Sequence, residues 1–181
     1  LGEIREDHYG RTLAYVFVGG NMVNAELLKA GWAHLFVLEP ITYYARFRRL
    51  QEEARRRRSG IWGTAGFTGP LKITTLHGNA QGDDRYNLNG EYVRLCNISP
   101  RDINIRGFSL ADRAGHTYIF PPAILRPGYT VLLFSGKGYD ITEGAPQLRL
   151  YWGSRYPIWN NDGDTAFLRD PQGRVINTVD Y

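Results

Sequence analysis

Four consecutive arginines, Arg55–Arg58, form the longest run of like charge in this sequence of 181 residues. Clustered basic side chains attract polyanions, so this run could contact a nucleic acid. The same residues fall in the last turn of a predicted helix, where positive charge complements the helix dipole. The second interpretation needs no ligand, and we favour it.

Carboxylates that could bind a metal ion occur in two places. Glu3, Glu6 and Asp7 cluster near the start of the sequence, and Asn161–Asp164 has the composition of a calcium loop. The latter segment is too short for an EF-hand and is typical of a hairpin turn, while the three acidic residues are typical of a solvated turn. We therefore expect no metal site in this chain.

The histidines of the second half and the one cysteine suggest structural positions. His77 and His116 have no ligand pattern near them, so we expect surface or turn positions for both. Cys96 is the only cysteine, which excludes an internal disulfide and a cysteine-rich zinc site. Its place within a strand pattern predicts a small core residue.

A group of aromatic residues near the C-terminal end has two interpretations. Its members are Tyr151, Trp152, Tyr156 and Trp159. Such a group could bind a sugar or a polymer. Packing at the edge of a sheet is the simpler expectation.

The elements that must position these residues differ between the two halves of the chain. Leu1–Glu6 and Thr12–Val18 are apolar-rich runs around a polar turn, which predicts a β-hairpin. Helical spacing follows over Val23–Ala30, with Asn24 as the expected N-cap and Gly31 as the stop.

A second helix is expected over residues 43–58, with one apolar face and one charged face. Tyr44, Phe47, Leu50 and Ala54 form the apolar face. Residues 64–70 are mostly small, flexible and end in proline, so we place a linker there. It would separate a first domain, residues 1–63, from a second, residues 71–181.

The second domain contains short runs of β character, separated by turn signals such as Asn-Gly, Pro-Gly and Asp-Gly. The runs are Leu71–Leu76, Glu91–Asn97, Ile103–Ile105, Phe108–Asp112, Thr117–Phe120, Thr130–Phe134, Arg149–Trp152, Thr165–Arg169 and Val175–Thr178. Their spacing predicts a β-sandwich without helices of useful length. The whole chain is therefore expected to be mainly β, with two domains.

Composition adds weaker constraints. The formal net charge is +4 with a pI near 9.3, and most of the excess lies in the first domain, which mildly favours a polyanionic partner there. No apolar run is long enough for a membrane span, so none is expected. The sequence begins at Leu1 inside a strand pattern, and we expect a segment upstream of it.

Three segments of the first domain resemble the thermonuclease, or staphylococcal nuclease, family. They are Asp7–Val16, Met22–Leu28 with Gly31, and Gly60–Trp62, in the family's order and spacing. Family members fold as a five-stranded OB barrel with three helices and hydrolyse DNA and RNA phosphodiesters with Ca²⁺, two arginines and a glutamate. The resemblance implies that residues 1–63 form a partial OB-fold, a β-hairpin plus two helices.

The same resemblance implies roles for four residues. Arg11 matches the family's second catalytic arginine and would contact the scissile phosphate with fixed charge and bidentate hydrogen bonds. His8 and Tyr9 match positions near the nucleotide's other phosphate, with His8 in place of a lysine. Phe36 could stack on a base, whereas Leu38 offers only apolar contact. The predicted nucleic-acid-binding set is therefore His8, Tyr9, Arg11 and Phe36, and Arg11 is the predicted catalytic residue.

The family's calcium-binding aspartates, first arginine and general-base glutamate all lie upstream of Leu1. The resemblance therefore implies that Ca²⁺ serves a longer parent nuclease, that no metal binds this chain alone, and that the isolated chain is inactive. A hairpin with two helices also leaves open strand edges and an uncovered apolar face. We expect the missing N-terminal half of the nuclease, or a second copy of this chain, to cover them.

The second domain is similar to the lamin tail family. The matching segments are Glu91–Asn97, Gly107–Asp112, Gly115–Pro121, Leu125–Gly128 and Trp159–Asp164. This family is an immunoglobulin-like β-sandwich found in nuclear lamins and in bacterial secreted or surface proteins. The resemblance implies a binding or anchoring role toward an unknown ligand, no catalytic residues, and an extracellular or cell-surface location.

Two hypotheses for function remain open from the sequence. In the first, the chain is part of a Ca²⁺-dependent nuclease that carries a lamin tail domain for binding or anchoring. In the second, it is a non-catalytic binding module whose half-nuclease is structural.

Overall fold

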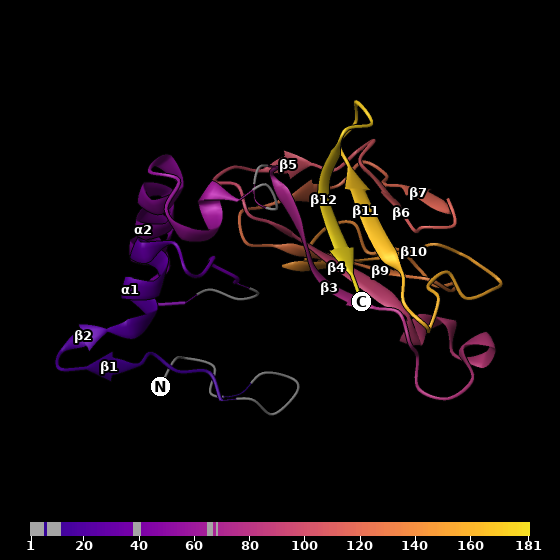
Figure 1. Ribbon diagram of the computed structural model, residues 1–181, viewed down its shortest axis with the longest axis horizontal. Coiled ribbons are helices and arrows are strands. Elements are labelled where there is room, and N and C mark those ends of the chain that lie inside the picture. Colours follow the sequence, from indigo (N-terminus) through magenta and orange to yellow (C-terminus); the bar gives the residue numbers. More distant parts are fainter. Residues whose placement is uncertain (1–5, 7–11, 38–40, 65–66, 68) are drawn as a thin grey trace. The chain divides into compact units, whose positions relative to one another are not determined.

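The chain divides into two compact units, Leu1–Thr64 and Ala65–Tyr181. The computed structural model describes residues 6, 12–37, 41–64, 67 and 69–181. Each unit has its own buried apolar cluster. The expected layout, a mainly β chain of two parts, is confirmed (Figure 1).

The first unit contains a short hairpin and two helices. Strands β1 (Phe17–Val18) and β2 (Asn21–Met22) pair antiparallel around Gly19 and Gly20. Both glycines have positive φ, 55° and 81°, which a two-residue turn of this kind requires. The expected strand over 12–18 is confirmed only at its last two residues. Thr12 forms an isolated antiparallel bridge with Glu6, and the rest of the expected partner strand, residues 1–5, lies outside the described residues.

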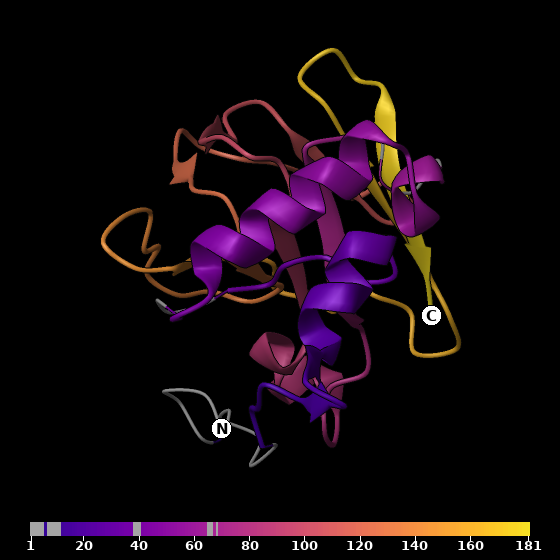
Figure 2. The ribbon, with the colours of Figure 1, turned by 90° about the vertical axis from the view of Figure 1, so that its left-hand side faces the viewer.

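Helix α1 (Val23–Ala30) follows β2 directly, and helix α2 (Tyr44–Arg56) lies beside it (Figures 1 and 2). Gly31 ends α1 in the left-handed conformation, as predicted. The expected N-cap is wrong, since Met22 occupies that position. The Asn24 side chain is used elsewhere: Oδ1 accepts the Val16 N–H at 2.8 Å, and Nδ2 donates to the Ala14 carbonyl at 3.3 Å.

The core of the first unit is small. Met22, Ala25 and Leu28 pack against Phe47, and Tyr15, Tyr43 and Leu50 cover this cluster partly. Helix α2 is shorter than the predicted range 43–58, but two residues of its predicted apolar face, Phe47 and Ala54, are buried. A short 3₁₀ helix, η1 (Gly60–Gly63), follows and buries Trp62.

The second unit is a sandwich of two four-stranded sheets and a two-stranded ribbon (Figure 1). One sheet has the order β10-β9-β4-β3, the other β12-β11-β6-β7, and β5 pairs with β8. The strands are β3 (Leu71–His77), β4 (Tyr92–Asn97), β5 (Ile103–Asn104), β6 (Ser109–Ala111), β7 (Thr117–Ile119), β8 (Ile124–Leu125), β9 (Thr130–Phe134), β10 (Gln147–Tyr151), β11 (Thr165–Arg169) and β12 (Val175–Asp180). All pairs are antiparallel except β9 with β10, which is parallel.

Alternating residues of these strands fill the space between the sheets. Val93, Leu95 and Leu133 come from one sheet, and Leu110 and Leu168 from the other. Each is at most 2% exposed, so the sandwich has a closed core. Cys96 is also fully buried, as predicted, and burial raises the pKa of its thiol to about 12, which keeps it inert at neutral pH.

Two 3₁₀ helices, η3 (Asp84–Tyr86) and η4 (Leu88–Gly90), shape the long connection between β3 and β4. The described part of the second unit contains no α-helix, in agreement with the expectation that no long helix occurs there. In the described residues, no helix is long and apolar enough to cross a membrane.

Candidate nucleic-acid interface

The residues predicted to contact phosphate in the first unit, His8, Tyr9 and Arg11, lie outside the described residues, as does Leu38. Phe36 is described and is 39% exposed, in the segment that follows α1. Leu35, next to it, donates its N–H to Oε1 of Gln51 at 2.5 Å. Gln51 is buried on α2, so this hydrogen bond fixes the backbone beside Phe36 to the helix.

Phe36 borders an apolar cavity of about 330 Å³ in the first unit. Leu13, Tyr15, Leu27 and Ile41 also line it. Within the described residues, the buried Tyr15 hydroxyl has no hydrogen-bond partner, although its ring packs edge-on against Tyr43 at 4.8 Å. The cavity is thus a mainly apolar recess with a polar group at its wall.

Large apolar side chains remain exposed around this recess and on the β1–β2 hairpin. They are Leu13, Val16, Phe17, Val18, Leu27, Trp32 and Phe36. Such a concentration on a unit of about sixty residues is unusual for a free surface. It is consistent with the expectation that other strands cover this face.

The arginine run at the end of α2 makes structural contacts. Arg55 forms an ion pair of 3.7 Å with Glu52, and its guanidinium lies 4.9 Å from the centre of the Trp62 ring. Arg57 donates to the carbonyl of Lys29 in the last turn of α1 at 3.3 Å. These contacts favour the helix-end interpretation for this pair over a nucleic-acid patch.

The segment Asn161–Asp164, which has the composition of a calcium loop, forms a turn. Gly163 donates its N–H to the Asn160 carbonyl at 3.0 Å. The buried Asp164 carboxylate accepts N–H groups of Arg113, Asn160 and Thr165 at 2.7 to 3.1 Å. In the part of the chain that the structure describes, no three His, Cys, Asp or Glu residues are placed to hold a metal ion.

Both histidines of the second unit have structural partners. His77 stacks on Tyr92 at 5.1 Å, and its Nδ1 lies 2.9 Å from the Gly90 carbonyl. His116 Nδ1 lies 2.6 Å from Oδ2 of the buried Asp112, in the β6–β7 turn. Turn and surface roles are therefore confirmed for these two residues.

The aromatic group near the C-terminal end divides in two. Tyr151 stacks on Phe134 at 5.1 Å, and Trp152 meets the buried Trp159 edge-on at 6.3 Å, so packing is confirmed for these residues. For Tyr156 the packing expectation is wrong, because its side chain is 76% exposed. The Tyr156 N–H and carbonyl both hydrogen-bond to the Ser154 hydroxyl, which fixes the backbone that presents the ring.

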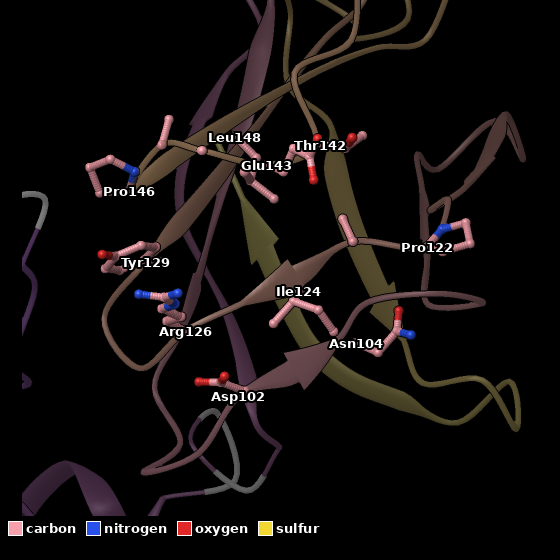
Figure 3. A pocket seen from close by; sticks show the side chains of 13 residues that line it. Asp102, Asn104, Pro122, Ile124, Arg126, Tyr129, Thr142, Glu143, Pro146 and Leu148 are labelled. Atoms are coloured by element: carbon pink, nitrogen blue, oxygen red, sulfur yellow. The ribbon is translucent and has the colours of Figure 1, made fainter.

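A cavity of about 680 Å³ lies between the β5–β8 ribbon and residues 142–146 (Figure 3). Charged side chains of both signs line it: Asp102 and Glu143 are acidic, and Arg126 is basic. The Arg126 guanidinium lies 6.0 Å from the centre of the Tyr129 ring. Because the acidic groups outnumber the basic one, this cavity offers no attraction to a polyanion.

A second surface pocket, of about 460 Å³, has a different character. Its charged lining residues are Arg85, Lys137 and Arg155, all basic, and the 88% exposed Tyr86 joins them. Local sequence patterns do not predict this pocket, because its residues come from three loops separated by up to 70 positions. The only feature of the sequence that could have indicated it is the presence of basic and aromatic residues in turn segments.

Comparisons with known proteins agree with the two units. Residues 1–64 match the family model described as staphylococcal nuclease homologue, and residues 65–181 match that described as Lamin Tail Domain. The chain is 45% identical over 65 residues to the endonuclease YncB of Bacillus subtilis (strain 168), which is 35% of this chain and 31% of that protein.

Further relatives have similar names. The SPbeta prophage-derived endonuclease YokF of Bacillus subtilis (strain 168) is 43% identical over 65 residues, 35% of this chain and 22% of YokF. A thermonuclease of Staphylococcus hyicus is 40% identical over 58 residues, 32% of this chain and 34% of the relative. The chain thus spans about a third or less of the length of these relatives.

Proposed function

The chain belongs to the Lamin Tail Domain family through residues 65–181 and carries a staphylococcal nuclease homologue domain over residues 1–64, and from this premise we propose that it is part of a nuclease that hydrolyses phosphodiester bonds of DNA or RNA. The observation that carries the proposal is the match of the first unit to relatives named endonuclease and thermonuclease. The lamin tail domain would serve for binding or anchoring.

In this proposal, the first unit supplies substrate contacts. Arg11 binds the scissile phosphate, where a guanidinium stabilises the charge that develops in the transition state. His8 and Tyr9 lie near a neighbouring phosphate, and Phe36 stacks on a base. The exposure of Phe36 and the hydrogen bond from Leu35 to Gln51 support its part in the scheme.

Ca²⁺ belongs to the proposal only as the cofactor of the complete enzyme. The described residues do not fit a calcium site, since no group of three acidic or histidine side chains converges among them. The metal ligands, a general base and the strands that cover the exposed apolar face would come from another segment or from a companion chain.

An extracellular or cell-surface location is also part of the proposal. It is supported by the lamin tail domain, which resembles domains of bacterial secreted and surface proteins. A single buried cysteine with an inert thiol is compatible with such a location.

The proposal is tested with purified chain, alone and mixed with a polypeptide that carries the remaining part of YncB. Gel filtration with light scattering measures association, and cleavage of labelled DNA is followed in Ca²⁺ and in EDTA. We expect the chain alone to self-associate and to be inactive. The mixture should cleave DNA in Ca²⁺ but not in EDTA.

Two substitutions sharpen this test. Arg11→Ala should abolish cleavage by the mixture, whereas Arg126→Ala in the second unit should leave it unchanged. A monomeric chain that stays inert in every mixture would contradict the nuclease proposal, and the non-catalytic binding module would then be the better description.

A further inference from the structure

The basic pocket of the second unit is lined by residues 85–89, 136–137 and 154–155, which belong to the loops 84–90, 135–138 and 153–156. We call it the loop pocket. Backbone contacts hold the loops together: Gly153 donates its N–H to the Gly136 carbonyl at 2.8 Å, and Ser154 donates to Ser135 at 3.0 Å. The loop pocket is therefore a built feature of the sandwich.

The loop of residues 84–90 is fixed to the loop of residues 135–138 by a side-chain hydrogen bond and by close packing. Nδ2 of Asn89 donates to the Lys137 carbonyl at 2.9 Å. Gly136 lies so close to Leu88 and Asn89 that a Cβ atom there would come within 3 Å of both side chains. The glycine thus allows the approach that places Lys137 beside the 84–90 loop.

Charge in the loop pocket has one sign. The lining residues Arg85, Lys137 and Arg155 are basic and exposed, and none of the residues lining this pocket is acidic. Arg85 is held by Asp83, which lies outside the lining, through hydrogen bonds of 2.7 to 3.2 Å. Among the described residues, Lys137 and Arg155 form no ion pair, so their charges remain available to a ligand.

Aromatic rings stand beside these charges. Tyr86 lines the loop pocket with an exposed fraction of 88%, and Tyr156, next to Arg155 in the chain, is 76% exposed. Exposed rings beside unpaired cations are the arrangement with which proteins bind single-stranded nucleic acid: cations contact phosphates, and bases stack on the rings. A recess of about 460 Å³ also suits one nucleotide better than the flat surface of a lipid bilayer.

We propose that the loop pocket binds single-stranded nucleic acid, with Lys137 and Arg155 on phosphates and Tyr86 and Tyr156 stacked on bases. This inference rests on the proposed function, because it makes the lamin tail domain the part that holds the nuclease substrate. The mixed-charge cavity of Figure 3 serves as an internal contrast, since its lining is not selective for a polyanion.

The test measures fluorescence anisotropy of a labelled oligothymidine with the full chain at several NaCl concentrations. The double substitution Lys137→Glu with Arg155→Glu should weaken binding at least tenfold. It should also reduce the slope of log K against log salt by about 1.4, which corresponds to two phosphate contacts on a single strand.

Two further variants isolate stacking. Tyr86→Ala with Tyr156→Ala should weaken binding about tenfold or more with an unchanged salt slope, since stacking releases no counterions. Tyr86→Phe with Tyr156→Phe keeps the rings and should bind like the unchanged chain. All of these side chains are exposed, and thermal unfolding checks that the fold is intact.

The matched control is Arg106→Glu with Arg126→Glu, the same change of charge at exposed positions of the same unit outside the loop pocket. This control should retain most of the affinity. Equal losses in the control and in the Lys137/Arg155 variant, or no loss in the latter, would overturn the inference. Binding to phosphatidylglycerol vesicles that depends on Lys137 and Arg155, without binding to the oligonucleotide, would overturn it in favour of a lipid surface.

Failure of this inference and failure of the proposed function can be told apart. The oligonucleotide measurements are repeated in the Arg11→Ala background, which removes the catalytic arginine but not the loop pocket. Cleavage by the complemented enzyme with no effect of the loop-pocket variants on binding rejects only the inference. Oligonucleotide binding that depends on the loop pocket, with no cleavage in any mixture, rejects only the nuclease.

Discussion

Oε2 of Glu91 accepts a hydrogen bond of 3.0 Å from the backbone N–H of Ile158, which joins the start of strand β4 to the segment before β11. Glu91 is fully buried. Burial raises the pKa of this carboxyl above its ordinary value of 4.5. Hydrogen bonds from the Ile158 N–H, the Ser135 side chain and the Trp159 backbone offset part of the increase, and the negative charge of Asp84 adds a smaller contribution to it.

This raised pKa predicts how stability changes with pH. Because the folded-state pKa exceeds the unfolded one, Glu91 contributes stability that is fully present below pH 4.5 and is lost as pH rises through the folded pKa. In Glu91→Gln the side chain stays neutral, so the decline in unfolding free energy at this site should disappear. Urea unfolding between pH 4 and pH 8 measures it, with Glu143→Gln, an exposed carboxyl, as control. Parallel pH profiles for Glu91→Gln and the unchanged chain would refute the assignment.

The hydrogen bonds of Asn97 predict that its replacement by Asp strongly lowers the stability of the second unit. Its buried Nδ2 donates to the carbonyls of Arg101 and Leu125 at 2.8 and 2.7 Å, and its Oδ1 accepts the Ser99 N–H and hydroxyl. Asn97→Asp removes both donors and turns a carboxylate toward two carbonyl oxygens. We expect a loss of unfolding free energy of at least about 2 kcal/mol.

Asn104→Asp is the control for Asn97, because the exposed Asn104 uses only its Oδ1, as acceptor of the Arg106 N–H. Denaturant unfolding of the second unit, followed by the fluorescence of Trp152 and Trp159, compares the two variants. A similar loss for both would show that the charge, and not the lost donors, is responsible.

The sequence predicted the sandwich better than the first unit, for a physical reason. Strands such as Thr130–Phe134 and Thr165–Arg169 are bounded by turn signals and have side chains that suit a buried sheet, so they could be located from local pattern alone. Strand β8, Ile124–Leu125, was missed because it is two residues long and lies between prolines. It is a strand only through its pairing with β5, which is distant in sequence.

In the first unit, tertiary contacts override local pattern. Asn24 has the residue type of an N-cap, yet its side chain bonds to Val16 and Ala14, and the helix begins before it. The loop pocket could not be predicted from the sequence for a similar reason, since Arg85, Lys137 and Arg155 come together only in the folded sandwich. Arg11 could be assigned from family resemblance alone, and that assignment stays a prediction.

Gly60, at the start of η1, lies directly against Gly31, which ends α1. Its φ is 55°, and a Cβ atom there would overlap the Gly31 carbonyl, which accepts the Ile61 N–H at 2.9 Å. Gly60→Ala should destabilise the first unit by about 2 kcal/mol or more, because both the backbone conformation and the space are unsuitable. Hydrogen exchange of the Ile61 amide should become correspondingly faster.

Gly20→Ala separates the two causes. Gly20 also has a positive φ, 81°, but a Cβ atom there would meet nothing within 4 Å. We expect this variant to cost about 1 kcal/mol, the conformational part alone. If Gly60→Ala is as stable as Gly20→Ala or more stable, the ends of the helices can separate at that point without a loss of unfolding free energy.

Gln51 connects the stability of the first unit with its proposed substrate contact. Its Oε1 accepts the Leu35 N–H, and Leu35 immediately precedes Phe36, the residue proposed to stack on a base. Gln51→Met keeps the length of the side chain but removes the acceptor, which leaves a part-buried N–H unpaired at a cost of about 1 to 3 kcal/mol. We expect faster hydrogen exchange at Leu35 and weaker binding of oligonucleotide to the first unit, measured in the Lys137→Glu/Arg155→Glu background.

Glu53→Met, at a partly exposed position of the same helix, is the matched control and should change neither quantity. If Gln51→Met accelerates exchange at Leu35 while binding stays constant, Phe36 does not contribute to nucleic-acid binding, because its backbone would have been released without consequence for the ligand.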